Sequence, residues 1–232
     1  REAYLYEYSN PECNFRPYDP ITRVQIERGE INEKCYTSTR ESIMLHGDSH
    51  SQHLFYGLEE NFSSKYDILQ ISAFSCRLEA KSPTKGCKAS NELFANKLMH
   101  INPDVLILSV RNGYETIDWS NYLKELHYIK NILILGPSPE NNIFRMKYGN
   151  KGYKVNNWKY MQEADSYMVN SINNIKGKYP NITYVSMKDL LCSNGKSSCL
   201  SEVGGVSMYA DGGHFSRAGS VEVTRLLKEM IQ

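Results

Sequence analysis

Five apolar runs along the chain have the length and composition of buried β-strands. They span residues 42–47, 66–74, 104–110, 131–137 and 182–187. The runs DVLILSV and NILILGP are almost continuously apolar, which is typical of strands that are covered on both faces of a parallel sheet. Each run ends close to a turn-forming or polar residue. The pattern therefore predicts five strands, and the continuous runs favour a parallel sheet.

Segments with helical periodicity separate these runs. The helices expected from the pattern span residues 49–62, 91–101, 160–179 and 216–232. In the first of them Leu54, Leu58 and Phe62 recur on one face, and the second stops before Asn102-Pro103. Strands that alternate with helices predict an α/β fold, a three-layer α/β/α sandwich around a five-strand parallel sheet.

The segment before the first run has a different character. Residues 1–40 are polar and aromatic with little periodicity, and they contain the turn-rich stretches NPEC and RPYDP. We expect residues 1–40 to be an N-terminal extension packed on a domain that comprises residues 41–232. A chain of 232 residues can form a core without splitting into two domains.

Composition narrows the class of partner. The chain is 41% hydrophobic and 23% charged, with a net charge of +1. Nucleic-acid binding usually requires a strongly basic surface, so this charge disfavours a nucleic-acid partner. No segment approaches the roughly 18 apolar residues of a membrane-spanning helix. The chain begins with Arg1 rather than Met, and we expect an excised or processed part of a longer protein.

Six cysteines indicate the redox environment. Six cysteines allow 15 pairings. Proximity along the chain favours three local pairs, and these join Cys13 to Cys35, Cys76 to Cys87, and Cys192 to Cys199. No CxxC pair occurs, which weighs against a zinc ribbon or a thioredoxin-like site. An even number of cysteines in loop-like surroundings favours an oxidising compartment, and buried free thiols in a cytosolic protein are the alternative.

The stretch IMLHGDSHSQHL carries the first candidate for chemistry. In an open α/β sheet, ligands bind beyond the carboxyl ends of the strands, and Ser49 follows the first strand at such an end. The free N–H groups of a helix N-terminus favour negative charge there, so a serine oxygen could attack a carbonyl and leave a stabilised oxyanion. We expect Gly47 to let Ser49 stand exposed at the helix start. The alternative is that Ser49 or Asp48 only caps the helix.

The stretch YADGGHFSRAGS carries the second candidate. Asp211 and His214 lie three residues apart, just before the final helix. A neutral histidine can accept the proton of a serine, and a carboxylate can hold that histidine in the required tautomer. The alternative is a glycine-rich turn with a capping aspartate and a surface histidine.

Together the two blocks, GDSH early and DGGHFS late, resemble the SGNH (GDSL-like) hydrolase superfamily. Within it, the chain is most similar to the periplasmic SGNH domains fused to acyltransferase-three membrane proteins, and its local cysteine pairs resemble that group as well. The resemblance implies that Ser49 is the nucleophile, His214 the base and Asp211 the residue that orients His214.

The oxyanion-stabilising residues match the superfamily less closely. The resemblance implies donors from the Ser49 N–H, from a glycine N–H after the second strand and from an asparagine side chain after the third. The second-strand loop reads SAFSCRLEA without glycine, so Ser75 is the counterpart there. Asn112 in LSVRNGYE takes the third position, with a simple Asn-Gly turn as the alternative. Phe215 follows His214 where leucine is usual.

The resemblance also implies what the domain acts on. Such proteins O-acetylate bacterial surface glycans such as O-antigen or peptidoglycan. We therefore expect an O-acetyltransferase with esterase side activity, placed in the periplasm or otherwise outside the cytoplasm and tethered to the inner membrane. The acceptor would be a glycan, no cofactor is expected in this domain, and acetyl-CoA would serve as donor to a membrane domain of the same protein. A carbohydrate O-acetylesterase and a catalytically silent glycan-binding module are the alternatives.

Three further features of the sequence could also carry function. His46, His50 and His53 crowd the Ser49 segment, but they lack the carboxylate of a motif such as H-E-x-x-H, so we expect solvated or packed histidines and no metal. The basic and aromatic run 145–161 predicts either a glycan-contacting loop or a plain solvated loop. Asn61 and Asn181 fit glycosylation sequons, which matter only in a eukaryotic secreted protein.

Overall fold

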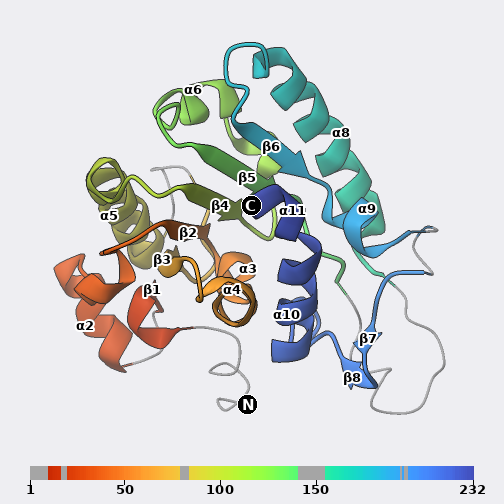
Figure 1. Ribbon diagram of the computed structural model, residues 1–232, viewed down its shortest axis with the longest axis horizontal. Coiled ribbons are helices and arrows are strands. Elements are labelled where there is room, and N and C mark those ends of the chain that lie inside the picture. The colour runs from red at the N-terminus through yellow and green to blue at the C-terminus, as the bar shows by residue number, and fades with distance from the viewer. Residues whose placement is uncertain (1–9, 17–19, 79–83, 141–154, 194, 196–197) are drawn as a thin grey trace.

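The structure is a computed structural model, and it describes residues 10–16, 20–78, 84–140, 155–193, 195 and 198–232. Within these residues one sheet of six parallel strands has the order β1-β3-β2-β4-β5-β6 (Figure 1). Its strands are β1 (Asn14–Phe15), β2 (Ser42–Gly47), β3 (Asp67–Ala73), β4 (Val105–Ser109), β5 (Asn131–Leu135) and β6 (Ile182–Val185). A separate antiparallel pair is formed by β7 (Glu202–Val203) and β8 (Val206–Ser207).

The α/β class and the five predicted strands are confirmed, but the strand number is one too low. The additional strand, β1, comes from the N-terminal extension and pairs with the end of β3, Asn14 beside Ser72 and Phe15 beside Ala73. A strand of two residues is too short to leave a periodic signal in the sequence. The extension thus contributes backbone to the sheet, and Phe15 is completely buried.

Helices cover both faces of the sheet, as the three-layer prediction requires. On one side lie α5, α6 and α8, and on the other lie α4, α10 and α11 (Figure 1). The helices are α2 (Pro20–Arg28), α3 (Ser49–Gln52), α4 (Phe55–Phe62), α5 (Lys85–Ile101), α6 (Trp119–Lys124), α8 (Trp158–Ile175), α9 (Met187–Leu191), α10 (Arg217–Leu226) and α11 (Lys228–Ile231). Short 3-10 turns occupy η1 (Pro11–Cys13), η2 (Glu33–Cys35) and η3 (Tyr114–Thr116).

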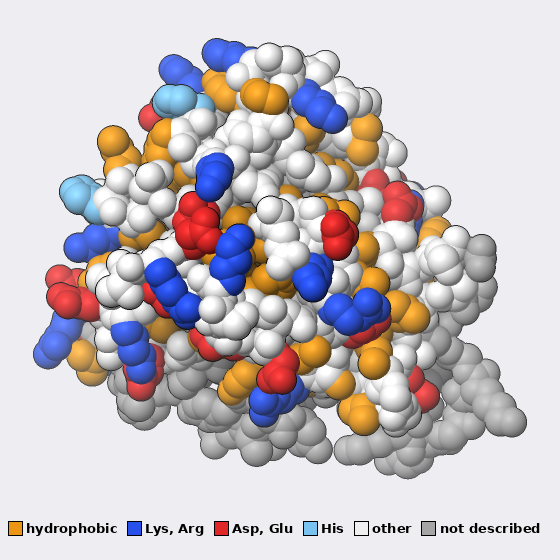
Figure 2. Space-filling model, in the orientation of Figure 1, with side chains coloured by type: hydrophobic (Ala, Val, Ile, Leu, Met, Phe, Trp, Pro, Cys, Tyr) orange, Lys and Arg blue, Asp and Glu red, His pale blue; other side chains and the backbone are white. Residues whose placement is uncertain are grey.

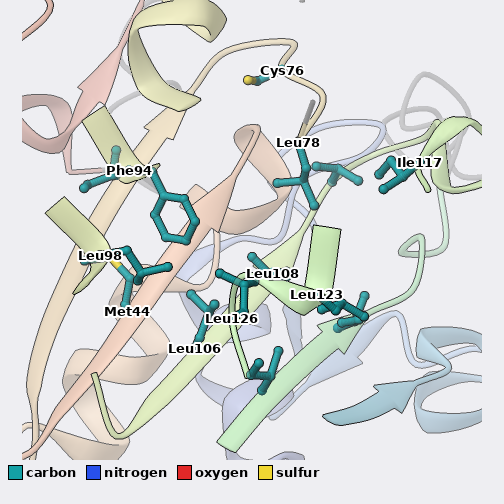
Figure 3. Packing of buried hydrophobic residues seen from close by; sticks show 14 of the residues in the cluster. Met44, Cys76, Leu78, Phe94, Leu98, Leu106, Leu108, Ile117, Leu123 and Leu126 are labelled. Atoms are coloured by element: carbon teal, nitrogen blue, oxygen red, sulfur yellow. The ribbon is translucent and has the colours of Figure 1, made fainter. Parts of the chain in front are cut away.

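Alternation along the strands divides the apolar core between the two faces. In β4, Leu106 and Leu108 point to the face covered by α5, α6 and α8, whereas Val105 and Ile107 point to the opposite face. Figure 3 shows the packing on the face covered by α5, α6 and α8, where Phe94 of α5 lies near the central strands. Because both faces are covered, the central strands read as continuous apolar runs in the sequence.

Two predicted helices have different bounds in the structure, because local hydrogen bonds set where they begin and end. The predicted helix 49–62 is two helices, because the chain turns more tightly at Leu54, whose N–H donates to the carbonyl of Ser51. Helix α5 begins earlier than expected, at a Thr84 cap that accepts from the Cys87 N–H. It stops at the Asn102-Pro103 pair, as the sequence predicts, and Asn102 ends it in the left-handed conformation.

Helices α4 and α10 pack in close contact at a glycine. A Cβ atom on Gly57 would lie 2.1 Å from the carbonyl oxygen of Ser220, and the Gly57 N–H donates to the Ser220 hydroxyl. The Asn61 side chain donates to Val221 and to Thr224 of α10. This contact fixes the final helix, and with it the loop that precedes it, against the helix that follows Ser49.

The surface carries charges of both signs. On the face shown in Figure 2, Lys and Arg side chains lie interspersed with Asp and Glu, in keeping with the net charge of +1. Among the helices in the described parts of the chain, none is both long enough and apolar enough to cross a membrane.

Candidate active site

The site is built at the carboxyl end of β2, a central strand of the sheet. Gly47, the last residue of β2, lies between Ser72 of β3 and Ser109 of β4. It has a φ of +143°, and a Cβ atom there would lie 1.9 Å from the Ser109 carbonyl oxygen. Only glycine permits both this φ and this close approach. The strand can therefore turn directly into α3 beside β4.

Asp48 and Ser49 have separate roles at the start of α3. The Asp48 carboxylate caps the helix by accepting from the His50 N–H at 2.8 Å, and its other oxygen accepts from the Arg111 N–H at 2.9 Å. Burial raises the pKa of Asp48 to about 6 despite these hydrogen bonds. Because Asp48 supplies the cap, the hydroxyl of Ser49, the first helical residue, is left for another partner.

That partner is His214. The Ser49 Oγ and the His214 Nε2 are 2.7 Å apart, and the His214 Nδ1 lies 2.7 Å from one oxygen of Asp211 and 2.9 Å from the other. The structure thus brings all three residues of the predicted nucleophile, base and carboxylate into one hydrogen-bonded chain. The two ends of this chain are 165 residues apart in sequence.

The Asp211 carboxylate also shapes the loop that carries His214. It accepts from the N–H groups of Gly213 and His214, at 2.9 and 2.8 Å. Burial alone would raise the pKa of Asp211, but the hydrogen bonds from His214 and from these backbone groups outweigh it and lower the pKa to about 2. Asp211 is therefore ionised at neutral pH and can stabilise a protonated His214.

The expected exposure of Ser49 is wrong. The residue is only 6% exposed, and the buried side chains of His50 and His53 lie beside His214. Their rings are fully buried, with centroids 5.3 Å (His50) and 6.1 Å (His53) from that of His214. Burial lowers the pKa of both side chains well below the usual histidine range, so both are neutral.

The predicted oxyanion donors follow the neighbouring strands. Ser75, just beyond β3, is exposed and has a φ of +51°, a left-handed conformation that favours glycine. The superfamily usually has glycine there, so the backbone shape fits although the residue type does not. Asn112, just beyond β4, is exposed and follows Arg111, whose N–H is held by Asp48. In the described part of the chain, no acceptor engages the N–H of Ser49, the N–H of Ser75 or the side-chain amide of Asn112.

A hydroxyl pair fixes the end of β3 next to α3. The Ser51 and Ser72 Oγ atoms are 2.8 Å apart, and the Ser51 hydroxyl also contacts the carbonyl of Asp48. Ser72 also accepts a hydrogen bond from Gln70. These buried contacts bring the loop of Ser75 to the same edge of the sheet as Ser49.

His46 lies away from the other histidines. Its ring stacks on Phe94 of α5 at a centroid distance of 3.7 Å, and its Nδ1 is 2.8 Å from the Ile71 carbonyl oxygen. Burial lowers its pKa to about 4. The histidines near Ser49 are thus packed side chains. Across the residues with described positions, no group of three or more His, Cys, Asp or Glu side chains could hold a metal ion.

The sequence did not single out an ion pair at the rim of the site. Arg111 and Glu140 form two hydrogen bonds of 2.7 and 2.8 Å, and Glu140 lies close to Gly213 in the His214 loop. Both residues follow strand ends, β4 and β5, so the rule that ligands bind at such ends could have suggested them. Residues 145–154 of the basic and aromatic run lie outside the described residues, while Tyr160 accepts from the Gly113 N–H.

The cysteines are paired as proximity along the chain favours. All six lie in described parts of the chain, and they form the disulfides Cys13–Cys35, Cys76–Cys87 and Cys192–Cys199. The Cys76–Cys87 disulfide joins the residue after Ser75 to the first turn of α5. It therefore anchors the loop that carries one candidate oxyanion donor.

Solved structures share this fold. The periplasmic domain of a lipopolysaccharide acetyltransferase from Salmonella ser. Paratyphi A superposes with a TM-score of 0.68 at 21% identity, over 99% of this chain and 93% of that one. A candidate SGNH hydrolase from Slackia heliotrinireducens superposes with a TM-score of 0.51 at 15% identity, over 84% of this chain and all of that one. At these identities the likeness shows the fold alone.

A family model gives the more specific result. No curated protein matches the chain significantly in sequence. The family model for the SGNH domain that is fused to AT3 domains matches residues 13–229, almost the whole chain. That range includes β1 and most of the N-terminal extension as well as the Ser49 and His214 blocks. The chain belongs to this family of SGNH domains.

Proposed function

We propose that this domain is a serine-dependent O-acetyltransferase that moves an acetyl group onto a sugar hydroxyl of a bacterial surface polysaccharide. The observation that carries the proposal is the hydrogen-bonded chain from the Ser49 Oγ through His214 to Asp211. It lies where an α/β sheet presents its ligands, and the three candidate donors that follow β2, β3 and β4 have no acceptor in the described residues.

The first half-reaction would acetylate Ser49. The Ser49 Oγ attacks the acetyl carbonyl carbon while its proton moves to the His214 Nε2, and Asp211 stabilises the resulting imidazolium. The tetrahedral intermediate then expels the donor group, which takes the proton back from His214. The products are an acetyl ester on Ser49 and the donor group, which leaves in its protonated form.

The second half-reaction would release the acetyl group to the acceptor. A sugar hydroxyl gives its proton to the His214 Nε2 as its oxygen attacks the ester carbon. The bond to the Ser49 oxygen breaks, and Ser49 recovers its proton from His214. Water in place of the sugar would give hydrolysis, so some esterase activity is expected.

The oxyanion of both intermediates needs donors close to Ser49. We assign this role to the N–H of Ser49, the N–H of Ser75 and the side-chain amide of Asn112. Donors aimed at the developing charge in a site without bulk water stabilise it strongly, and losing one typically costs about 10²- to 10³-fold in rate. The left-handed backbone of Ser75 and the anchoring of the Arg111 N–H by Asp48 support this assignment.

The domain would work as the extracytoplasmic part of a larger protein. Its family is fused to AT3 domains, and the Salmonella structure is described as a periplasmic domain of a lipopolysaccharide acetyltransferase. Three disulfides fit an oxidising compartment. In this arrangement a membrane domain would receive the acetyl group from acetyl-CoA and present it to Ser49, and a lipopolysaccharide or peptidoglycan sugar would accept it.

Turnover of p-nitrophenyl acetate tests the serine chemistry. The Ser49→Ala and His214→Ala variants should each lose roughly three or more orders of magnitude in rate while remaining folded. Equal rates in the wild type and both variants would refute the mechanism. A glycan-binding module without catalysis predicts that outcome, together with glycan binding that does not depend on Ser49.

An assay with a glycan acceptor distinguishes acetyl transfer from hydrolysis. Wild-type protein is incubated with p-nitrophenyl acetate and either O-antigen polysaccharide or peptidoglycan fragments, and the acetyl content of the glycan is measured. An O-acetyltransferase acetylates one of these glycans in a Ser49-dependent way. An O-acetylesterase instead releases acetate from an acetylated glycan and adds none.

A further inference from the structure

We propose that His53 is a positioning residue that holds His214 in register with Ser49 through the N–H of Phe215. The Phe215 N–H donates to the His53 Nδ1 at 3.2 Å, in a buried contact between residues 162 positions apart. The consequence for catalysis rests on the proposed function, whereas the contact itself can be tested without it.

Three of the backbone donors around His214 are used within a short loop. The N–H groups of Gly213 and His214 donate to Asp211, and the Ser216 N–H donates to the carbonyl of Met208. These three bonds stay within the loop or close its base. The Phe215 N–H is the donor that leaves the loop, and it reaches His53.

His53 is itself tied to the nucleophile. It forms the C-cap of α3, and its N–H donates to the Ser49 carbonyl oxygen at 3.1 Å. One turn of backbone therefore joins Ser49 to His53. The Ser49 hydroxyl contacts His214, and the His53 ring contacts Phe215, the residue after His214. Two adjacent residues of the loop are thus held by the two ends of one short helix.

Burial keeps the His53 ring neutral, as this contact needs. An amide N–H can only donate, so the Nδ1 carries no proton and the neutral ring has its proton on Nε2. Burial, then the neighbouring His50 and His214, lower the pKa of His53 well below its usual range. The ring also packs on Phe215 at a centroid distance of 4.3 Å.

This arrangement matters because the Ser49–His214 hydrogen bond is sensitive to small shifts. A displacement of about 1 Å at a reacting group can cost roughly 100-fold in rate. The Asp211 hydrogen bonds fix the His214 ring relative to its own loop but not relative to α3. The His53 contact supplies a direct connection between the loop and the helix that carries Ser49, in addition to the packing of α10 on α4.

The test compares two substitutions at this position. His53→Leu removes the acceptor and keeps an apolar side chain, while in His53→Asn the Oδ1 stands where the Nδ1 stood and can accept the same hydrogen bond. We expect His53→Leu to lower kcat for p-nitrophenyl acetate roughly 10- to 100-fold with little change in KM, and His53→Asn to stay within about threefold of wild type.

A matched control separates positioning from general destabilisation. His46→Leu also removes a buried neutral histidine, but one whose ring stacks on Phe94 of α5 and not on the His214 loop. It should lower the melting temperature but leave kcat within about threefold of wild type. If His46→Leu and His53→Leu lose kcat equally, or if His53→Asn fails to restore it at an unchanged melting temperature, the positioning role is wrong.

A second measurement stands apart from turnover. Amide hydrogen exchange of Phe215 should be slow in the wild type and in His53→Asn, and at least about tenfold faster in His53→Leu. Equal exchange in all three proteins overturns the proposal. A wild type without turnover but with the expected exchange pattern would instead overturn the proposed function and leave the contact standing.

Discussion

At the residue scale, three consecutive residues at the end of β2 meet three different physical requirements. Gly47 allows a backbone approach that any side chain would block, Asp48 satisfies helix and loop N–H groups, and Ser49 contacts His214. The sequence could predict Ser49, Asp211 and His214 because each lies in a short block with a recognisable order. The bond from Arg111 to Asp48 spans 63 positions and has no local signature.

Gly47→Ala should lower the free energy of unfolding by about 3 kcal/mol or more, because it adds strain at a positive φ to a clash with the Ser109 carbonyl. Gly177→Ala is the control, since nothing lies within 4 Å of its added Cβ. We expect that variant to stay within about 1 kcal/mol of wild type by urea denaturation. A Gly47 variant as stable as the Gly177 variant would contradict the close approach at the strand end.

Asp211→Asn should lower turnover of p-nitrophenyl acetate by about 10³- to 10⁴-fold. An amide N–H2 facing the His214 Nδ1 favours the tautomer with its proton on Nε2, which cannot accept the Ser49 proton. The loop should persist, because the amide oxygen can still accept from the N–H groups of Gly213 and His214. Turnover close to wild type, in a variant with an unchanged melting temperature, would remove Asp211 from the mechanism.

At the scale of elements, a helix or strand could be predicted from the sequence when it is long and when its burial leaves a regular apolar pattern. The five predicted strands lie side by side, most of them between helical layers, so their apolar runs were visible. The two-residue β1 and the six-residue α6 are too short for periodicity to reveal. The left-handed conformation of Ser75 could not be predicted from the sequence for another reason. Sequence rules assign that conformation to glycine, and here the surrounding structure imposes it on serine.

The Cys76–Cys87 disulfide should influence the site, and the Cys192–Cys199 disulfide should not. Replacing either pair by serines removes a cross-link and should lower the free energy of unfolding by about 2–4 kcal/mol. Cys76 follows Ser75 directly, so the first double variant should also lose roughly tenfold or more in kcat for p-nitrophenyl acetate. Equal kcat in the two double variants, measured below both melting temperatures, would argue against Ser75 as an oxyanion donor.

At the scale of the whole molecule, the fold gathers distant blocks at one edge of the sheet. Ser49 follows β2, Ser75 follows β3, Arg111 and Asn112 follow β4, and the His214 loop precedes α10. Parallel topology makes this edge predictable from the order of strands and helices. The packing of His50 and His53 against His214 was not predictable, because it depends on how α10 and its preceding loop dock against α3 and α4.

Stability should fall as the pH is lowered from about 6.5 towards 4. The unfolded chain binds protons at its histidines near pH 6.5, while buried His46, with a pKa of about 4, stays neutral in the folded state, as do His50 and His53. His46 alone then costs about 3 kcal/mol across this range. The pKa of Asp48, raised to about 6, and the raised pKa of Glu59 act in the opposite direction, but they are two groups against three.

Urea denaturation at pH 7 and at pH 5 measures this effect. His46→Leu removes one of the three sites, so that variant should lose less stability than wild type between the two pH values. Stability that is constant or higher at pH 5 would show that the histidines are not buried in their neutral form. That outcome would also contradict the packing of His50 and His53 beside His214 near Ser49.

The central claim, that Ser49 carries the acetyl group, is tested most directly by trapping it. Wild-type protein is mixed with p-nitrophenyl acetate, quenched in acid within the first turnovers, digested and examined by mass spectrometry. The account predicts that the peptide containing Ser49 gains the mass of one acetyl group, that His214→Ala gains far less, and that Ser49→Ala gains none there. An unmodified Ser49 peptide while p-nitrophenol is being released, or equal acetylation in His214→Ala, would contradict it.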